Sequence, residues 1–133
     1  VRGAIRSLMR DLLTRKDTLA ASVQRDSLIE EIIEMEPGEQ IQWCLSLYEG
    51  DYVSGIVDEV DGEPLNIYFM NRPNYVKMKN DEDFEFYGGE GVGAYELNDL
   101  YVEENGEWYL VLHNSARLYG REVLIELVRL HYE

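Results

Sequence analysis

The chain of 133 residues has the length of one domain, and 45% of its residues are hydrophobic and 29% are charged. This balance excludes the composition of a disordered or a membrane-embedded chain. The only cysteine is Cys44, which excludes an intramolecular disulfide and a zinc site made of cysteines alone, so we expect a reducing, cytoplasmic environment. The first residues do not have the charged and apolar regions of a secretory signal, and we expect none.

The formal net charge of −15 is distributed unevenly along the chain. Residues 1–26 hold six basic and three acidic residues, whereas the remainder holds six basic and 24 acidic residues. An acidic domain repels nucleic acids and anionic membranes, because binding either requires Lys or Arg at the phosphates. We therefore expect no nucleic-acid partner, and contact with a membrane only through the N-terminal segment.

The first sixteen residues have the periodicity of an amphipathic α-helix. Their apolar residues follow the spacing i, i+3, i+4, i+7, and Arg2, Arg6 and Arg10 recur at every fourth position. We expect this helix either to dock on the rest of the chain or to mediate self-association through residues 1–16. A basic amphipathic segment also suits a membrane surface. Residues 1–26 are thus predicted to form a helix and linker, and residues 27–133 the folded domain.

From residue 27 onward the hydrophobic pattern alternates, and turn residues recur at nearly regular intervals. The predicted turns are Pro37-Gly38, 49–51, Asp61-Gly62, Gly88-Gly89, Asn105-Gly106 and Gly120. The predicted strands are 28–35, 40–48, 52–60, 65–71, 83–87, 95–102, 107–113 and 121–132. About eight short antiparallel strands predict a mainly β fold, a β-sandwich of the jelly-roll type.

One interruption of the strand pattern predicts a short helical turn. Asn71 is a residue type that caps helices, and Pro73 suits the first turn, so the turn is expected from Asn71 to about residue 79. The glycine-rich stretch 88–93 contains a glutamate and is not followed by Lys and Ser or Thr. It is therefore predicted to be a flexible hairpin loop rather than a phosphate-binding loop.

Few residues point to catalysis. His113 and Ser115 share a strand face by parity, but no Gly-x-Ser-x-Gly elbow or third group accompanies them. His131, near the end of the sequence, is a weaker candidate. We predict no catalytic residues and no enzymatic activity, because a catalytic His113 requires a carboxylate from another strand to orient its ring.

Two acidic turns are candidates for a cation site. Carboxylates on a turn supply the oxygen ligands that Ca²⁺ prefers, but neither stretch matches a twelve-residue EF-hand loop. Solvated charge is the interpretation that we favour, and no cofactor is expected. The candidate ligands are Asp58, Asp61, Glu63, Asp81 and Asp83.

The stretches MEPGEQIQWCLSLYEGDYVSGIV, LNIYFMNRPNYVKM, DFEFY and NGEWYLVLHNS together resemble the GOLD domain and its prokaryotic relatives. The resemblance covers residues 27–133, with a Pro-Gly turn, a Gly-Asp turn and a final Gly-x-Trp-x-Leu-x-Leu-x-Asn strand.

The alternation of the strands also predicts where single side chains lie. By parity, Trp43 and Trp108 face the core, and Cys44 is expected to be a small packed residue. The structural signature residues are Pro37, Gly38, Gly50, Gly106, Trp108, Leu110, Leu112 and Asn114.

The resemblance implies a compact β-sandwich used for contacts between proteins, and it implies no catalytic residues. Our leading hypothesis is a non-catalytic protein-binding or adaptor module. The alternative is a lectin-like sandwich that binds carbohydrate or Ca²⁺, which needs converging carboxylates or a row of exposed rings from the ten tyrosines and two tryptophans.

Overall fold

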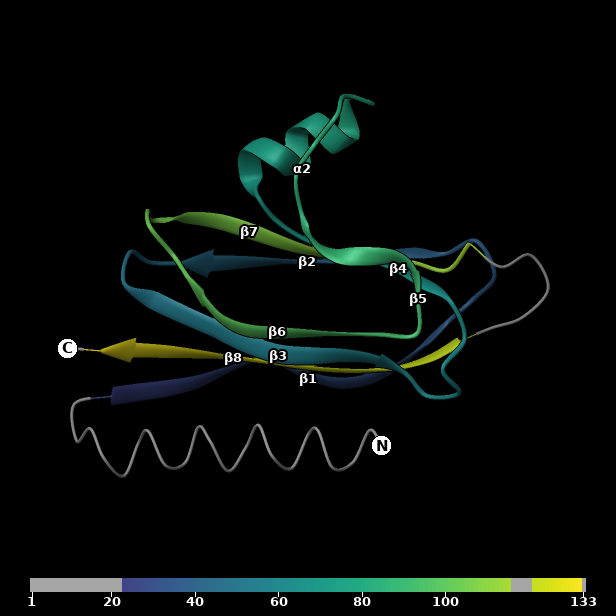
Figure 1. Ribbon diagram of the computed structural model, residues 1–133, viewed down its shortest axis with the longest axis horizontal. Helices are drawn as coiled ribbons and strands as arrows, with labels where there is room; N and C mark the ends of the chain where they lie inside the picture. The colour runs from purple at the N-terminus through teal and green to yellow at the C-terminus, as the bar shows by residue number, and fades with distance from the viewer. Residues whose placement is uncertain (1–22, 116–120, 133) are drawn as a thin grey trace.

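Eight strands and one short helix make up the computed structural model, which describes residues 23–115 and 121–132 (Figure 1). The predicted helix over residues 1–16 and the predicted turn at Gly120 lie outside the described residues. The elements are β1 (Val23–Met35), β2 (Gln40–Leu47), β3 (Asp51–Glu59), β4 (Leu65–Asn71), α2 (Arg72–Lys79), β5 (Tyr87–Val92), β6 (Ala94–Tyr101), β7 (Gly106–His113) and β8 (Arg121–Tyr132).

The strands form two antiparallel four-stranded sheets, in the orders β1-β8-β3-β6 and β2-β7-β4-β5. The first strand therefore pairs with the eighth, the second with the seventh, the third with the sixth and the fourth with the fifth. A long hairpin rolled up on itself gives this order, which is that of a jelly roll. The predicted β-sandwich is confirmed. Within the described part of the chain, no helix combines the length and the apolarity needed to span a membrane.

The core lies between the two sheets. Strand β2 shows the expected pattern most clearly, since its exposed residues alternate with residues that are more buried. Leu110 and Leu112 of β7 are fully buried, and they pack with Val123, Ile125 and Leu127 of the opposite sheet. Trp43 and Trp108 are half-buried and pack against this core. The core-facing row predicted from strand parity is therefore confirmed.

The sandwich has two different ends. The turn end consists of the connections 36–39 and 60–64 together with Asn114, and it lies at the right of Figure 1. The groove end consists of the connections 48–50 and 102–105 and the start of α2, and its two connections lie at the left. Strand β7 runs from one end to the other.

Asn114 closes the turn end. It is fully buried, and its side-chain amide donates hydrogen bonds to the carbonyls of Glu36 (3.1 Å) and Met35 (3.4 Å). Its own carbonyl accepts the N–H of Gly38 (2.8 Å), which adopts a left-handed φ of 77° in the predicted turn. The signature residue Asn114 therefore joins segments that are far apart in the sequence.

The predicted helical turn is confirmed. α2 starts after Asn71, whose side-chain oxygen accepts the backbone N–H of Asn74 (3.2 Å), and a proline occupies its first turn. A side-chain acceptor at this position satisfies a helix N–H that has no partner within the helix.

Two predictions for residues 83–93 are wrong. The segment 83–86 is not a strand, because Phe84 and Phe86 instead pack on the ring of Tyr68, on the outer face of β4. The glycine-rich stretch is not a hairpin loop, since it forms most of edge strand β5. A Cβ at Gly88 would lie 2.0 Å from the carbonyl oxygen of Ile67, so glycine allows the backbones to approach closely.

Candidate functional site

Two adjoining hollows, of about 540 and 690 Å³, open at the groove end. The first is lined by residues 69–71, Asn74, 84–87 and Trp108, and the second by residues 71–73, Tyr87 and 100–108. Asn71, Tyr87 and Trp108 line both hollows. We call the two hollows together the end groove.

The two aromatic residues at the centre of the end groove come from different strands. Trp108 has the same parity on β7 as Leu110, and its ring packs on Phe69 with centroids 5.1 Å apart. Tyr87, the first residue of β5, is 44% exposed, and its ring centroid lies 6.3 Å from that of Trp108. Trp108 thus contacts the core on one side and lines the groove on the other.

The wall beside α2 is held by amide side chains. The side-chain nitrogen of Asn74 donates to the side-chain oxygen of Asn71 (2.9 Å), and the side-chain oxygen of Asn74 accepts the backbone N–H of Glu85 (2.9 Å). These bonds tie the start of α2 to the segment that leads into β5. The sequence indicated the cap at Asn71 but not the long-range bond of Asn74.

The opposite wall is formed by the connection 102–105, which is joined to the connection 48–50. The side-chain oxygen of Asn105 accepts the backbone N–H of Glu49 (2.7 Å). Gly50 donates its N–H to the carbonyl of Val102 (3.0 Å), and Val102 donates its own to the carbonyl of Asp51 (2.8 Å). Three hydrogen bonds therefore fix this wall.

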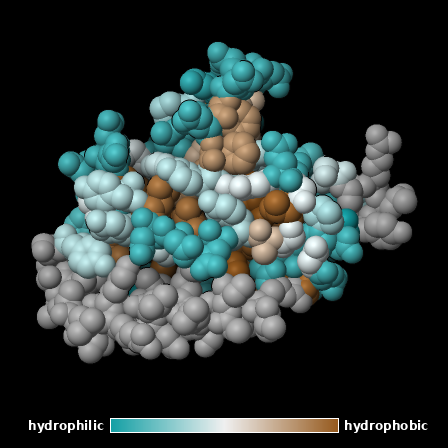
Figure 2. All heavy atoms as spheres, viewed as in Figure 1, coloured by the Kyte–Doolittle hydropathy of each residue, from teal (hydrophilic) through white to brown (hydrophobic). Residues whose placement is uncertain are grey.

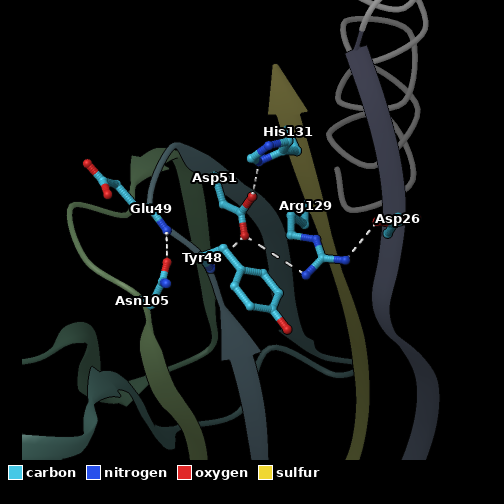
Figure 3. A network of polar contacts seen from close by, with 7 residues as sticks. All are labelled: Asp26, Tyr48, Glu49, Asp51, Asn105, Arg129 and His131. Carbon is cyan, nitrogen blue, oxygen red and sulfur yellow. Dashed lines mark hydrogen bonds and ion pairs between the residues drawn. The ribbon is translucent and has the colours of Figure 1, made fainter. Parts of the chain in front are cut away.

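A charge network centred on the buried Asp51 lies behind that wall (Figure 3). The carboxylate of Asp51, only 1% exposed, accepts the backbone N–H of Tyr48 (2.8 Å) and lies 2.6 Å from Nδ1 of His131. Its second oxygen is 3.9 Å from the guanidinium of Arg129, which also contacts Asp26 at 2.7 Å. The network ties the ends of β1, β3 and β8 together.

Sequence reasoning missed this network, although a signal was present. Arg129 and His131 continue the spacing of Ile125 and Leu127 on β8, so two polar residues occupy positions on the core-facing side. A buried charge is stable when it is paired and hydrogen-bonded. The turn predicted at residues 49–51 indicated that Asp51 lies at the end of a strand, but it did not indicate which residues contact Asp51.

The rim of the second hollow carries more negative than positive charge. It contains Arg72, Glu103, Glu104 and Glu107. Arg72 is paired with Glu107 at 3.2 Å. Glu103 and Glu104 are exposed and have no ion-pair partner within residues 23–115 and 121–132. The charge on the rim that is not neutralised is therefore acidic.

Next to the groove, the outer face of β7 carries a polar cluster around Tyr109. The hydroxyl of Tyr109 donates to Glu107 (2.7 Å) and accepts from Arg72 (2.8 Å). The bond to Glu107 and burial raise the pKa of Tyr109 to about 12, and the same bond lowers the pKa of Glu107.

The prediction that Cys44 is a packed residue is wrong. Cys44 is exposed because it lies on the outer face of its strand, and its thiol donates a hydrogen bond to Glu107 (3.3 Å).

A smaller hydrophobic layer fills the space between α2 and the outer face of its sheet, and Figure 2 shows hydrophobic residues gathered beneath the helix. Tyr75 of α2 stacks on Tyr109 with centroids 3.9 Å apart. The layer anchors the helix whose first turn borders the end groove. Its members are Tyr68, Met70, Tyr75, Met78, Phe84, Phe86, Tyr109 and Val111.

The candidate cation ligands are not brought together. Among the described residues, no three His, Cys, Asp or Glu side chains are placed to hold a metal ion. In the first acidic turn, the buried carboxylate of Glu59 accepts the backbone N–H groups of Asp61 (3.1 Å) and Glu63. Asp58 is buried on β3, and Asp81 and Asp83 are exposed in the segment after α2.

The histidines occupy different environments. His113 is half-buried opposite Gln40 and Asn66, and it has no carboxylate partner within the described ranges. Ser115 is exposed. His131 is oriented by Asp51, although no hydroxyl or thiol of the described residues is bonded to its other ring nitrogen.

No family model matches the chain, and no curated protein matches it. Among solved structures, it is similar to Aeromonas hydrophila PliG, a periplasmic lysozyme inhibitor of g-type lysozyme, with 12% identity and a TM-score of 0.44 over 86% of this chain and 90% of that one. It is also similar to the Podospora anserina GH26-CBM35 beta-(1,4)-mannanase, with 12% identity and a TM-score of 0.35 over 84% of this chain and 25% of that one. Neither likeness identifies a family.

Proposed function

We propose that the protein is a non-catalytic protein-binding module and that the end groove is its binding surface. The observation that carries this proposal is the pair of rings, Tyr87 and Trp108, at the junction of two hollows. Tyrosine and tryptophan are enriched among the residues that contribute most to binding between proteins, especially where they line a pocket. The resemblance to GOLD domains agrees with this role.

The walls of the groove support the same function. One wall is held by the hydrogen bonds that the Asn74 side chain donates to Asn71 and accepts from Glu85. The other is held by bonds between the connections 48–50 and 102–105. A preformed surface loses little conformational entropy when a partner binds, so more of the contact energy appears as affinity.

The arrangement of polar residues favours binding over catalysis. His131 has its carboxylate partner in Asp51, but a nucleophile within hydrogen-bonding distance of the ring is also needed for the familiar hydrolytic mechanisms. Asp51 is hydrogen-bonded to the backbone N–H of Tyr48 and lies beside Arg129. These contacts suit a carboxylate that stabilises the fold.

Carbohydrate binding receives weaker support. Tyr52, Tyr101 and Tyr132 lie together, with centroids of 5.2 Å and 5.5 Å from the central ring. Their planes are inclined by 52° and 89°, so the rings do not present one flat face. These three residues therefore do not form the row of parallel ring faces that suits a chain of sugars.

Selection of a displayed library of random peptides against the full chain tests the proposal. We expect the enriched peptides to lose at least about tenfold in affinity for Tyr87→Ala, since truncating a central aromatic residue costs about 2 kcal/mol or more. Trp108→Phe provides a second variant that keeps a ring against Phe69, and a smaller loss of affinity is expected. Affinity is measured by calorimetry, and folding by circular dichroism.

Tyr132→Ala is the matched control. Tyr132 is 39% exposed, close to the value for Tyr87, and it also has one aromatic neighbour, but it lies on the other sheet. We expect the selected peptides to bind this variant as they bind the original chain. Peptides that lose affinity for Tyr132→Ala and not for Tyr87→Ala would refute the end groove as the binding surface.

A further inference from the structure

The charge around the end groove indicates which kind of protein segment it accepts. Resting on the proposed protein-binding function, we infer that the groove recognises an arginine side chain presented by a cationic partner protein. The guanidinium stacks on Tyr87 and Trp108 and is neutralised by the glutamates of the rim. The partner is thus defined by its chemistry: a basic surface loop or strand that carries an arginine.

The first support is the charge of the rim. Glu103 and Glu104 lie on the wall of the second hollow, are exposed, and have no ion pair with any residue that the structure describes. Arg72, the basic residue lining that hollow, is already paired with Glu107. Glu85 lines the first hollow. A bound anionic segment would meet two unneutralised carboxylates, whereas a cationic segment would neutralise them.

The second support is the position of the rings. Tyr87 is 44% exposed and its centroid lies 6.3 Å from that of Trp108, with an angle of 34° between the planes. A planar cation gains energy over the face of tyrosine or tryptophan within about 6 Å of the centroid. Arginine suits this site better than lysine, because its guanidinium stacks on a ring while its N–H groups reach carboxylates.

The third support is the charge of the whole chain. The net charge is −15, and residues 27–133 contain four times as many acidic as basic residues. Such a field accelerates encounters with basic proteins and slows encounters with acidic ones. The overall field brings a cationic partner near, and the rim glutamates determine where its arginine binds.

A pair of peptides that differ only in charge tests the inference. The first is acetyl-Gly-Arg-Gly-Arg-Gly-amide, and the second has citrulline, an uncharged analogue of the same shape, in place of both arginines. We expect the arginine peptide to shift the backbone amide signals of residues 84–87 and 100–108 of the full chain in NMR spectra. The citrulline peptide should bind at least about tenfold more weakly. A third peptide, with lysine in place of both arginines, should have an affinity between those of the other two. Equal binding of the arginine and citrulline peptides would overturn the inference.

Charge variants separate the rim from the overall field. The double variant Glu103→Gln with Glu104→Gln should lower the affinity for the arginine peptide by about tenfold. Glu31→Gln with Glu34→Gln changes the net charge equally, but these exposed residues lie on β1, away from the groove. The control should bind within about twofold of the original chain. Equal losses from both double variants would refute the rim as the arginine site.

The outcomes also distinguish this inference from the proposed function. If the selected library peptides bind at Tyr87 but are neutral or acidic, the binding surface stands and the arginine preference is wrong. If the selected peptides bind elsewhere on the chain, the proposed function itself fails.

Discussion

The two ends of strand β7 show how one strand serves two purposes. At the turn end, Asn114 is fully buried and donates hydrogen bonds to backbone carbonyls from another part of the chain. At the groove end, Trp108 is half-buried, packs on Phe69 and lines two hollows. A satisfied polar side chain closes the first end, and a partly covered ring leaves the second open. The open end is nevertheless held from behind by the Asp51 network.

The largest effect that we expect concerns this network. Asp51→Ala removes the partner of His131 and leaves the N–H of Tyr48 without its acceptor, so we expect a loss of about 2 to 3 kcal/mol in the free energy of unfolding. Urea denaturation measures the loss. A change as small as that of an exposed charge would show that the groove end is not held by Asp51.

Asp26→Ala is the control for that measurement, since Asp26 contacts the same Arg129 from an exposed position. An exposed ion pair contributes about 1 kcal/mol or less. The difference between the two variants separates the buried part of the network from its surface part.

A smaller effect is expected at the turn end. Asn114→Ala should lower the free energy of unfolding by about 1 to 3 kcal/mol, because the buried carbonyl of Met35 and the partly buried carbonyl of Glu36 lose their donor. Asn105→Ala, at the groove end, removes an acceptor of the exposed Glu49 N–H. It should cost about 0.5 kcal/mol, because water replaces the lost bond. Equal losses in the free energy of unfolding for the two variants would contradict the contrast between a closed turn end and an open groove end.

The last effect that we expect is a pH dependence of stability on the outer face of β7, which appears only at alkaline pH. The bond to Glu107 raises the pKa of Tyr109 to about 12, above the value of about 10 in the unfolded chain. The native state therefore holds a proton that the unfolded state loses, so this contribution to stability is complete below pH 10 and is lost as the pH rises towards 12.

Stability curves of the original chain and of Tyr109→Phe test this prediction. Between these pH values the original chain should lose stability more steeply than the variant, which lacks the titrating hydroxyl. Ultraviolet titration provides a second measurement, since Glu107→Gln should lower the pKa of Tyr109 towards its ordinary value. Parallel stability curves would show that the hydroxyl is not held by Glu107.

Much of the fold could be predicted from local patterns. Alternation on β7 identified the buried row of Leu110 and Leu112, and the cap at Asn71 identified α2. Alternation misled at Phe84 and Phe86, because these residues pack on the outside of the sandwich without pairing as a strand. Periodicity reports which residues are buried, whereas backbone pairing decides what becomes a strand.

The candidate site was harder to predict, because it combines residues that are distant in the sequence. Trp108 was predicted as a core residue, and only its position at the open end gives it a second role. Tyr87 enters the groove because the glycines that follow it pair closely with β4. The bond between Asp51 and His131 spans 80 positions. A local pattern can mark such a residue as core-facing, as it does for His131, but it does not identify the distant partner.

The most direct test of the end groove is a map of where a selected peptide binds. Backbone amide signals of the full chain are recorded by NMR as the tightest library peptide is added. We predict shifts at residues 84–87 and 100–108, and unchanged signals at residues 36–39 and at Asn114. Shifts confined to the turn end or to the outer faces of the sheets would contradict the assignment of the end groove as the binding surface.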